Sequence, residues 1–290
     1  MGAPISVRRR LVSGQSVRLS QPLFWGDGLS ARFLAGPSGN ITVTASATTH
    51  TPGSWTQLLA DNATSETAGL LVVYATNTTA NTTDTGMLVD IGTGASGSEV
   101  VRVPSLAISQ QAAQFTAIPI RIPGSTRVAA RIQSSVASRT ASLGAALFAT
   151  PFADRLPLEV DVLGTSTAAS VGTAMSGASG TWVEITSSTT KDYQSLILVP
   201  SLSDSNSGGN VMVRYDLGIG ASGSESAVAA AHFLYTATPA VGGPNIAAMP
   251  GLLGGVYGAF VPSGTRIAVR HNRASNPERI DACVIGVPYA

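Results

Sequence analysis

The stretch Met87–Glu99, MLVDIGTGASGSE, recurs later in the chain as Met212–Glu225, MVRYDLGIGASGSE. A second pair follows in the same order: Ile122–Arg131 reads IPGSTRVAAR, and Val261–Arg270 reads VPSGTRIAVR. Matched stretches in a constant order indicate an internal duplication, in which each copy is one structural unit.

The two copies differ in length. The spacing is 126 residues between Asp90 and Asp216 but 139 residues between Arg127 and Arg266, so the second copy carries an insertion between these landmarks. The chain therefore divides into an N-terminal arm at 1–39, a first repeat at 40–153 and a second repeat at 160–290, with Ala153–Glu159 between the repeats.

Both copies read as β-structure. Short runs rich in Val, Ile and Leu, such as Leu70–Ala75 and Ser195–Pro200, are bounded by clusters of Gly, Pro, Asn and Ser. No long amphipathic helical pattern is present. The sequence predicts an all-β protein of two tandem β-sandwich or jelly-roll-like domains with an N-terminal extended arm.

Arginines mark one face of a strand in each copy. Within Thr126–Ser134, every second residue points to the same side of a strand. Arg127 and Arg131 therefore lie on one face, and Val128 and Ile132 lie on the other. In the second copy the arginines on the equivalent face are Arg266 and Arg270. Because the planar guanidinium group of arginine can donate several hydrogen bonds at once, we expect these four side chains to supply assembly contacts.

The composition favours a protein that lives in an assembly. Charged residues make up 11% of the chain, against roughly 25% in ordinary soluble domains. The net charge is +1, so little repulsion opposes association and no strong field attracts nucleic acid or a membrane surface. No secretory signal follows Met1–Arg10, and no apolar stretch of about 20 residues predicts a membrane span.

The N-terminal segment carries basic and aromatic residues that suit an interface. Arg8, Arg9 and Arg10 come first, and Phe24 and Trp25 follow. About 35 residues cannot close a core alone, so this segment either adds a strand to the first copy or docks on a neighbouring subunit. Three arginines in a nearly neutral chain do not predict nucleic-acid binding.

Each copy contains the pattern G-x-G-x-x-G, at Gly92, Gly94 and Gly97 and again at Gly218, Gly220 and Gly223. A dinucleotide site requires a helix to open at the last glycine, whereas Ser98–Pro104 is rich in β-branched residues and ends in proline. We therefore expect structural turns and no cofactor. The acidic residues after these turns, Glu99 and Glu225, could each pair with an arginine of their own unit, for example Arg127 or Arg266.

No catalytic or metal-binding pattern is present. His50, His232 and His271 have no metal-ligand spacing. Cys283 could be combined with His271 and Asp281 as a thiol nucleophile, but it lies in the apolar run Ala282–Val287, where cysteine is normally a core residue. We expect no catalytic residue and no metal, and a single cysteine forms no disulfide within the chain.

The segment MLVDIGTGASGSEVVRVPSL, followed by IPIRIPGSTRVAARIQSS, resembles repeats in tailed-phage virion structural proteins of the tail-fibre or tail-associated type. The pattern occurs at Leu88–Ser134 and, less closely, at Val213–Asn272, where Ser226–Ala237 is alanine-rich. The resemblance implies a non-enzymatic virion protein whose partners are other virion proteins and copies of itself.

Two alternatives stay open. A capsid decoration (cement) protein on the phage head would use the same duplicated modules and docking arm. A carbohydrate-binding module would take a host surface glycan as its partner, and it would present tryptophan on an exposed face. Trp55 and Trp182 occupy equivalent positions, which favours a structural role common to both units.

Overall fold

A computed structural model describes residues 31–36, 41–77, 87–108, 114–165, 173–175, 180–202, 209–237, 256–257, 260–272 and 280–290. Strands dominate these residues, and one 3₁₀ turn, η1 (Ala153–Arg155), lies between the two repeats. The all-β prediction is confirmed. No helix in the described ranges is long and apolar enough to cross a membrane.

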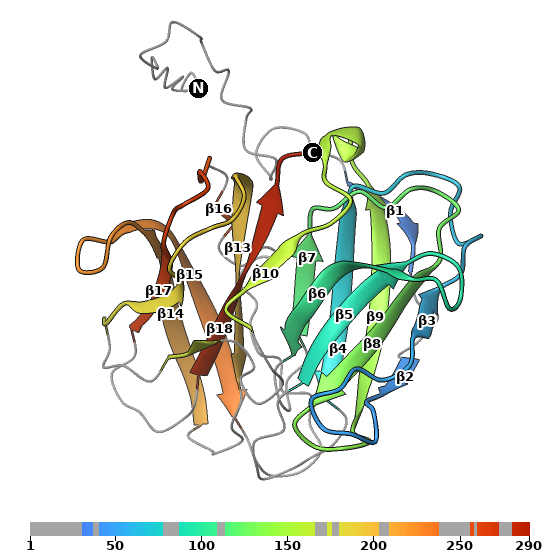
Figure 1. Ribbon diagram of the computed structural model, residues 1–290, viewed down its shortest axis with the longest axis horizontal. Helices are drawn as coiled ribbons and strands as arrows, with labels where there is room; N and C mark the ends of the chain where they lie inside the picture. Colours follow the sequence, from blue (N-terminus) through green and yellow to red (C-terminus); the bar gives the residue numbers. More distant parts are fainter. Residues whose placement is uncertain are drawn as a thin grey trace, which may run out of the picture.

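The first unit is built from two antiparallel sheets (Figure 1). Sheet I has the order β1-β9-β4-β7, with β2 also paired to β9, and sheet II has the order β3-β8-β5-β6. The strands are β1 (Arg32–Ala35), β2 (Ile41–Thr44), β3 (Thr56–Leu59), β4 (Leu70–Asn77), β5 (Met87–Thr93), β6 (Val100–Ile108), β7 (Gln114–Ile118), β8 (Val128–Ser134) and β9 (Thr140–Ala149).

The second unit repeats this topology strand for strand. Sheet III has the order β10-β18-β13-β16, with β11 also on β18, and sheet IV has the order β12-β17-β14-β15. The strands are β10 (Asp161–Leu163), β11 (Thr173–Ala174), β12 (Val183–Thr186), β13 (Tyr193–Leu202), β14 (Gly209–Ile219), β15 (Ser226–Ala237), β16 (Val256–Tyr257), β17 (Ile267–Asn272) and β18 (Ile280–Pro288). The identical strand orders show that the duplicated sequence encodes a duplicated β-sandwich.

Alternation along β8 and β17 directs the core-facing side chains. Val128, Ile132, Ile267 and Val269 are buried in hydrophobic clusters between the sheets, as the period of two predicts. The residues between them belong to the opposite face of sheets II and IV, which carries the arginines.

Sheet III is buried on both faces. Leu196, Leu198 and Val284 pack toward sheet IV in the core of the second unit. Their neighbours along the strands, such as Ile197 and Ile285, belong to the core cluster of the first unit instead. Because both faces are covered, Leu196–Pro200 of β13 and Ala282–Val287 of β18 read as continuous apolar runs without alternation.

Strand β6 is the part of the first unit that sheet III meets. Strands β10, β13 and β18 all lie against β6. The amide of Val160 donates a hydrogen bond to the carbonyl of Arg102 at 3.0 Å, which ties the link between the units to the edge of β6. Sheet III therefore lies against the edge of sheet II that β6 forms.

The N-terminal boundary differs from the expected one. The arm was expected to extend to residue 39, but β1 pairs with β9, with Arg32 opposite Ala149 and Phe33 opposite Phe148. Residues 32–35 thus complete sheet I, because β9 would otherwise have an unpaired edge beside β2. Residues 1–30, with Arg8, Arg9, Arg10, Phe24 and Trp25, lie outside the described residues.

Candidate functional site

The charged residues common to both units gather on the outward face of sheets II and IV, which we call the arginine face. Cross-strand register brings them together: Asp90 lies opposite Arg131, and Asp216 lies opposite Arg270. In the first unit the face comprises Trp55, Asp90, Glu99, Arg127 and Arg131, and in the second it comprises Trp182, Asp216, Glu225, Arg266 and Arg270.

Arg127 joins three separate segments of the first unit. Its guanidinium forms an ion pair with Glu99 and donates through Nε to Oε1 of Gln57 at 3.0 Å. The second carboxylate oxygen of Glu99 accepts a hydrogen bond from the amide of Gly97 at 3.0 Å. Only 1% of the Glu99 side chain is exposed, so the ion pair closes over the glycine turn.

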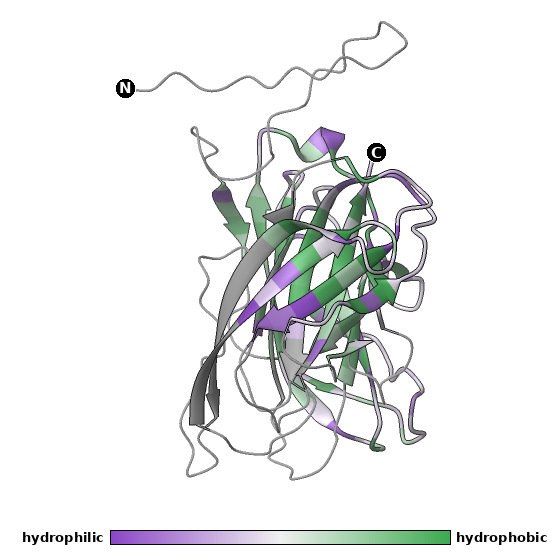
Figure 2. Cartoon of the chain, turned by 90° about the vertical axis from the view of Figure 1, so that its left-hand side faces the viewer, coloured by the Kyte–Doolittle hydropathy of each residue, from purple (hydrophilic) through white to green (hydrophobic). Residues whose placement is uncertain are grey.

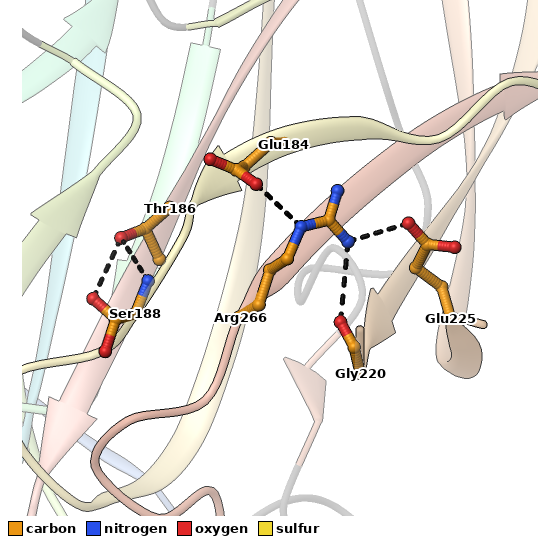
Figure 3. A network of polar contacts seen from close by, with 6 residues as sticks. All are labelled: Glu184, Thr186, Ser188, Gly220, Glu225 and Arg266. Atoms are coloured by element: carbon orange, nitrogen blue, oxygen red, sulfur yellow. Dashed lines mark hydrogen bonds and ion pairs between the residues drawn. The ribbon is translucent and has the colours of Figure 1, made fainter. Parts of the chain in front are cut away.

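The second unit repeats this network around Arg266 (Figure 3). Arg266 Nη1 donates to Oε1 of Glu225 at 2.7 Å, and Nε donates to Oε2 of Glu184 at 2.6 Å. Glu184 stands where the first unit has Gln57, so the second arginine lies between two carboxylates, as Figure 3 shows. The predicted pairing of the two glutamates with the arginines of their own units is confirmed.

A second arginine in each unit stacks on tryptophan. Arg131 Nε donates to Oδ2 of Asp90 at 2.8 Å, and its guanidinium lies 4.6 Å from the centre of the Trp55 ring. The other oxygen of Asp90 accepts a hydrogen bond from the amide of Ser105 at 2.8 Å. This arrangement holds the Trp55 ring, which precedes β3, together with a cation on β8 and a buried carboxylate on β5.

The equivalent group in the second unit has one difference. Arg270 donates to Asp216 Oδ2 at 2.8 Å and lies 4.5 Å from the centre of the Trp182 ring. Here the other carboxylate oxygen accepts a hydrogen bond from Arg214 Nε at 2.8 Å, where the first unit uses a backbone amide. Asp216 is therefore shared between two arginines.

Two of the predicted turn glycines have another role. Gly92 and Gly218 lie inside strands β5 and β14, not in the turns. A Cβ atom on Gly92 would lie 2.7 Å from Cη2 of Trp55, and one on Gly218 would lie 2.6 Å from Cη2 of Trp182. Their missing side chains make room for the tryptophan rings, which is the physical reason for this correction.

The remaining glycines do form turns. Gly94 and Gly97 have φ of 128° and 83°, and Gly220 and Gly223 have φ of 123° and 80°. Strands β6 and β15 begin after these turns, at Val100 and Ser226, where a nucleotide-binding fold would require a helix. The glycines thus supply the left-handed backbone that reverses the chain between paired strands.

The ion pairs of the arginine face make the stability of the fold depend on pH in the acid range. Burial raises the pKa of Glu99, but the hydrogen bonds from Arg127 and from backbone amides outweigh it and hold the pKa below its ordinary value of 4.5. The pKa of Glu225 is lowered in the same way by backbone hydrogen bonds and by Arg266. A carboxylate whose pKa is lower in the folded state stabilises the fold above its unfolded pKa.

We therefore expect the free energy of unfolding to fall as the pH drops below about 4.5 through the lowered pKa values of Glu99 and Glu225. The double variant Glu99→Gln, Glu225→Gln should flatten this slope in urea titrations performed from pH 6 down to the acid limit, at roughly half-unit steps. Glu159→Gln, at a mostly exposed side chain, is the matched control. An unchanged slope in the double variant would show that these pairs do not set acid stability.

The thiol lies in the interface between the two units. Cys283 is fully buried in β18, and burial raises the pKa of its thiol to about 12. A backbone hydrogen bond with Ala107 links it to β6. His271, by register, belongs to the core face of sheet IV with Ile267 and Val269, so sheet III lies between it and Cys283. The structure does not bring these two residues together.

The arginines expected to make assembly contacts are engaged within their own units. The side chains of Arg127 and Arg266 are largely buried, and those of Arg131 and Arg270 are about one-third exposed. Their role in assembly stays a prediction. From the sequence, Asp90 and Asp216 were assigned no role in the site. Their equivalent positions in the duplicated stretch were the signal that could have identified them.

No family model matches the chain, and no curated protein matches it. Two solved structures are similar. The PBSX exported protein XepA shares 9% identity over 99% of this chain and 100% of its own, with a TM-score of 0.25. PNGase F, a glycosylasparaginase from Flavobacterium meningosepticum, shares 12% identity over 87% of this chain and 96% of its own, with a TM-score of 0.32.

Proposed function

We propose that the chain is a non-enzymatic structural protein of a bacteriophage particle, associated with the tail, which works by burying surface against its neighbours. The sequence resemblance at Leu88–Ser134 and Val213–Asn272 indicates the phage particle. The low charge of the chain suits a component that stays in contact with other proteins.

The observation that carries the structural role is the repetition of one ion-pair network in both units. Glu99 with Arg127 and Glu225 with Arg266 close the same glycine turn, and Asp90 and Asp216 hold the stacked arginines in the same register. When the duplicated charged groups hold strands together in both copies, their common role is architecture. The duplicated residues therefore support a scaffold.

The N-terminal segment is the proposed anchor. Since β1 belongs to sheet I, the anchoring part is residues 1–30, which carry the basic and aromatic groups. Buried aromatic side chains with flanking arginines are typical of the residues that dominate interface energies.

Purified particles test the proposal. Particles separated on a density gradient should contain the protein, and a variant that lacks residues 2–30 should fold with the same circular dichroism spectrum but be missing from particles. Absence of the full chain from particles would refute the function, and normal incorporation of the shortened chain would refute the anchor. Copy number decides the location: hundreds of copies indicate a cement protein on the head, whereas a few to some tens indicate the tail.

A further inference from the structure

The outward face of sheet I carries a cluster of exposed aromatic rings, with threonine and serine at other outward positions. Phe33 packs edge-on against Phe148 with ring centres 5.6 Å apart, and Tyr74 packs on Phe115 at 4.8 Å. Phe33 and Phe115 are nevertheless 58% and 60% exposed. By register, none of the outward positions on the described strands of sheet I carries a charge. Exposed aromatic clusters of this kind mark interaction surfaces.

The equivalent face in the second unit is covered by another part of this protein. Val72 pairs with Ala146 in sheet I, and Val199 pairs with Cys283 at the equivalent place in sheet III. Val72 and Ala146 are half-buried, whereas Val199 and Cys283 are buried against the first unit. The molecule itself therefore shows what this kind of face packs against: another β-sandwich of the same family of repeats.

The outward face of sheet IV carries a charge where the outward face of sheet II does not. Leu88, on the outward face of sheet II, is buried beside Ala107, where the second unit packs. Its equivalent on sheet IV is Arg214, which is exposed and bonded to Asp216. Figure 2, which looks onto the second unit, shows hydrophilic residues among the hydrophobic ones along the strands nearest the viewer. The packing used between the units thus cannot be repeated at sheet IV without burying a charge.

Aromatic side chains on the outward face of sheet I and a charge on the outward face of sheet IV favour a closed pair over an open filament. Head-to-tail contact would press the aromatic cluster of sheet I onto Arg214, and a buried charge is costly. Contact between two copies of sheet I places uncharged aromatic surface against its own kind, which is what a two-fold interface requires.

We infer that two copies of the chain form a two-fold dimer through the outward faces of sheet I, with Phe33, Val72, Tyr74, Phe115, Ala146 and Phe148 in the interface. This inference rests on the proposed assembly function, for which it names the partner and the surface. The dimer is measured on purified protein and incorporation is measured in particles, so either can fail while the other holds.

Sedimentation velocity of the full chain over a concentration series tests the dimer. Wild type should dimerise, and Phe115→Ser should raise the dissociation constant by about tenfold or more, because an exposed aromatic side chain of the interface is lost. Phe33→Ser should act in the same direction. Phe260→Ser is the matched control: this side chain is 52% exposed but belongs to the second unit, so the dissociation constant should not change.

Three results would overturn the inference. The first is a chain that stays monomeric throughout the series. The second is a dimer that Phe33→Ser and Phe115→Ser leave intact. The third is a dimer that weakens with Phe24→Ser or Trp25→Ser but not with Phe115→Ser, since the N-terminal segment would then make the contact. Circular dichroism spectra equal to wild type keep the comparison free of folding defects, because both sheet I positions are mostly exposed.

Discussion

In Val199→Asp, the second unit is expected to unfold at a much lower urea concentration than in wild type. Val72→Asp is expected to change the urea midpoint of the first unit little. The two valines occupy equivalent positions on β13 and β4. Val199 is 4% exposed and lies between sheet III and the first unit, so an aspartate there would be a buried, unpaired charge. Such a charge costs about 4 kcal/mol or more, whereas a half-exposed position costs about 1 kcal/mol.

Urea titrations followed by circular dichroism and tryptophan fluorescence measure this difference. They should be performed at a protein concentration where both variants are monomeric, because Val72 also lies in the proposed dimer interface. Equal shifts of the two midpoints would contradict the packing of sheet III on the first unit. The comparison uses one substitution at two equivalent sites, so the intrinsic strand preference of aspartate cancels.

Gly218→Ala is expected to destabilise the protein by about 1–3 kcal/mol, because the added methyl group would overpack the Trp182 ring. The new Cβ atom would lie 2.6 Å from Cη2 and from Cζ3 of the indole. The ring would have to move, and its stacking on Arg270 would be lost with it. The measurement is the free energy of unfolding from urea titration.

A double-mutant cycle isolates the contact. In a Trp182→Ala background, Gly218→Ala should cost little, which gives a coupling energy of about 1 kcal/mol or more. Gly223→Ala is the control, since its φ is +80° and no atom lies within 4 Å of its added Cβ. Its cost comes from the backbone and should be the same with or without Trp182. A cycle with no coupling at Gly218 would show that the ring does not depend on this glycine.

The sequence predicted the parts of the fold that depend on local patterns. Alternation around Arg127 and Arg131 assigned the two faces of β8 correctly, and the repeated Glu99 and Glu225 indicated the ion pairs. These predictions succeeded because each depends on neighbours along one strand or on the position of a residue relative to its repeat.

What failed depends on contacts between distant strands. Gly92 is expected from the sequence to form a turn, but it lies inside β5, and its reason is the ring of Trp55, which precedes β3. The run Leu70–Ala75 predicted a strand without showing that the outward face of sheet I differs in exposure from that of sheet III. Exposure of this kind is decided by what packs on a sheet, and one strand carries no information about that.

The double burial of sheet III has a consequence for how the protein is made. A ribosome releases the first unit before β13 and β18, so β6 can already be in place when the strands that pack on it emerge. Translation from the N-terminus therefore provides the surface of β6 before the strands that pack on it are made. With the two units exchanged along the gene, the apolar side of sheet III around Ile197 and Ile285 would emerge with nothing to cover it, and aggregation would compete with folding.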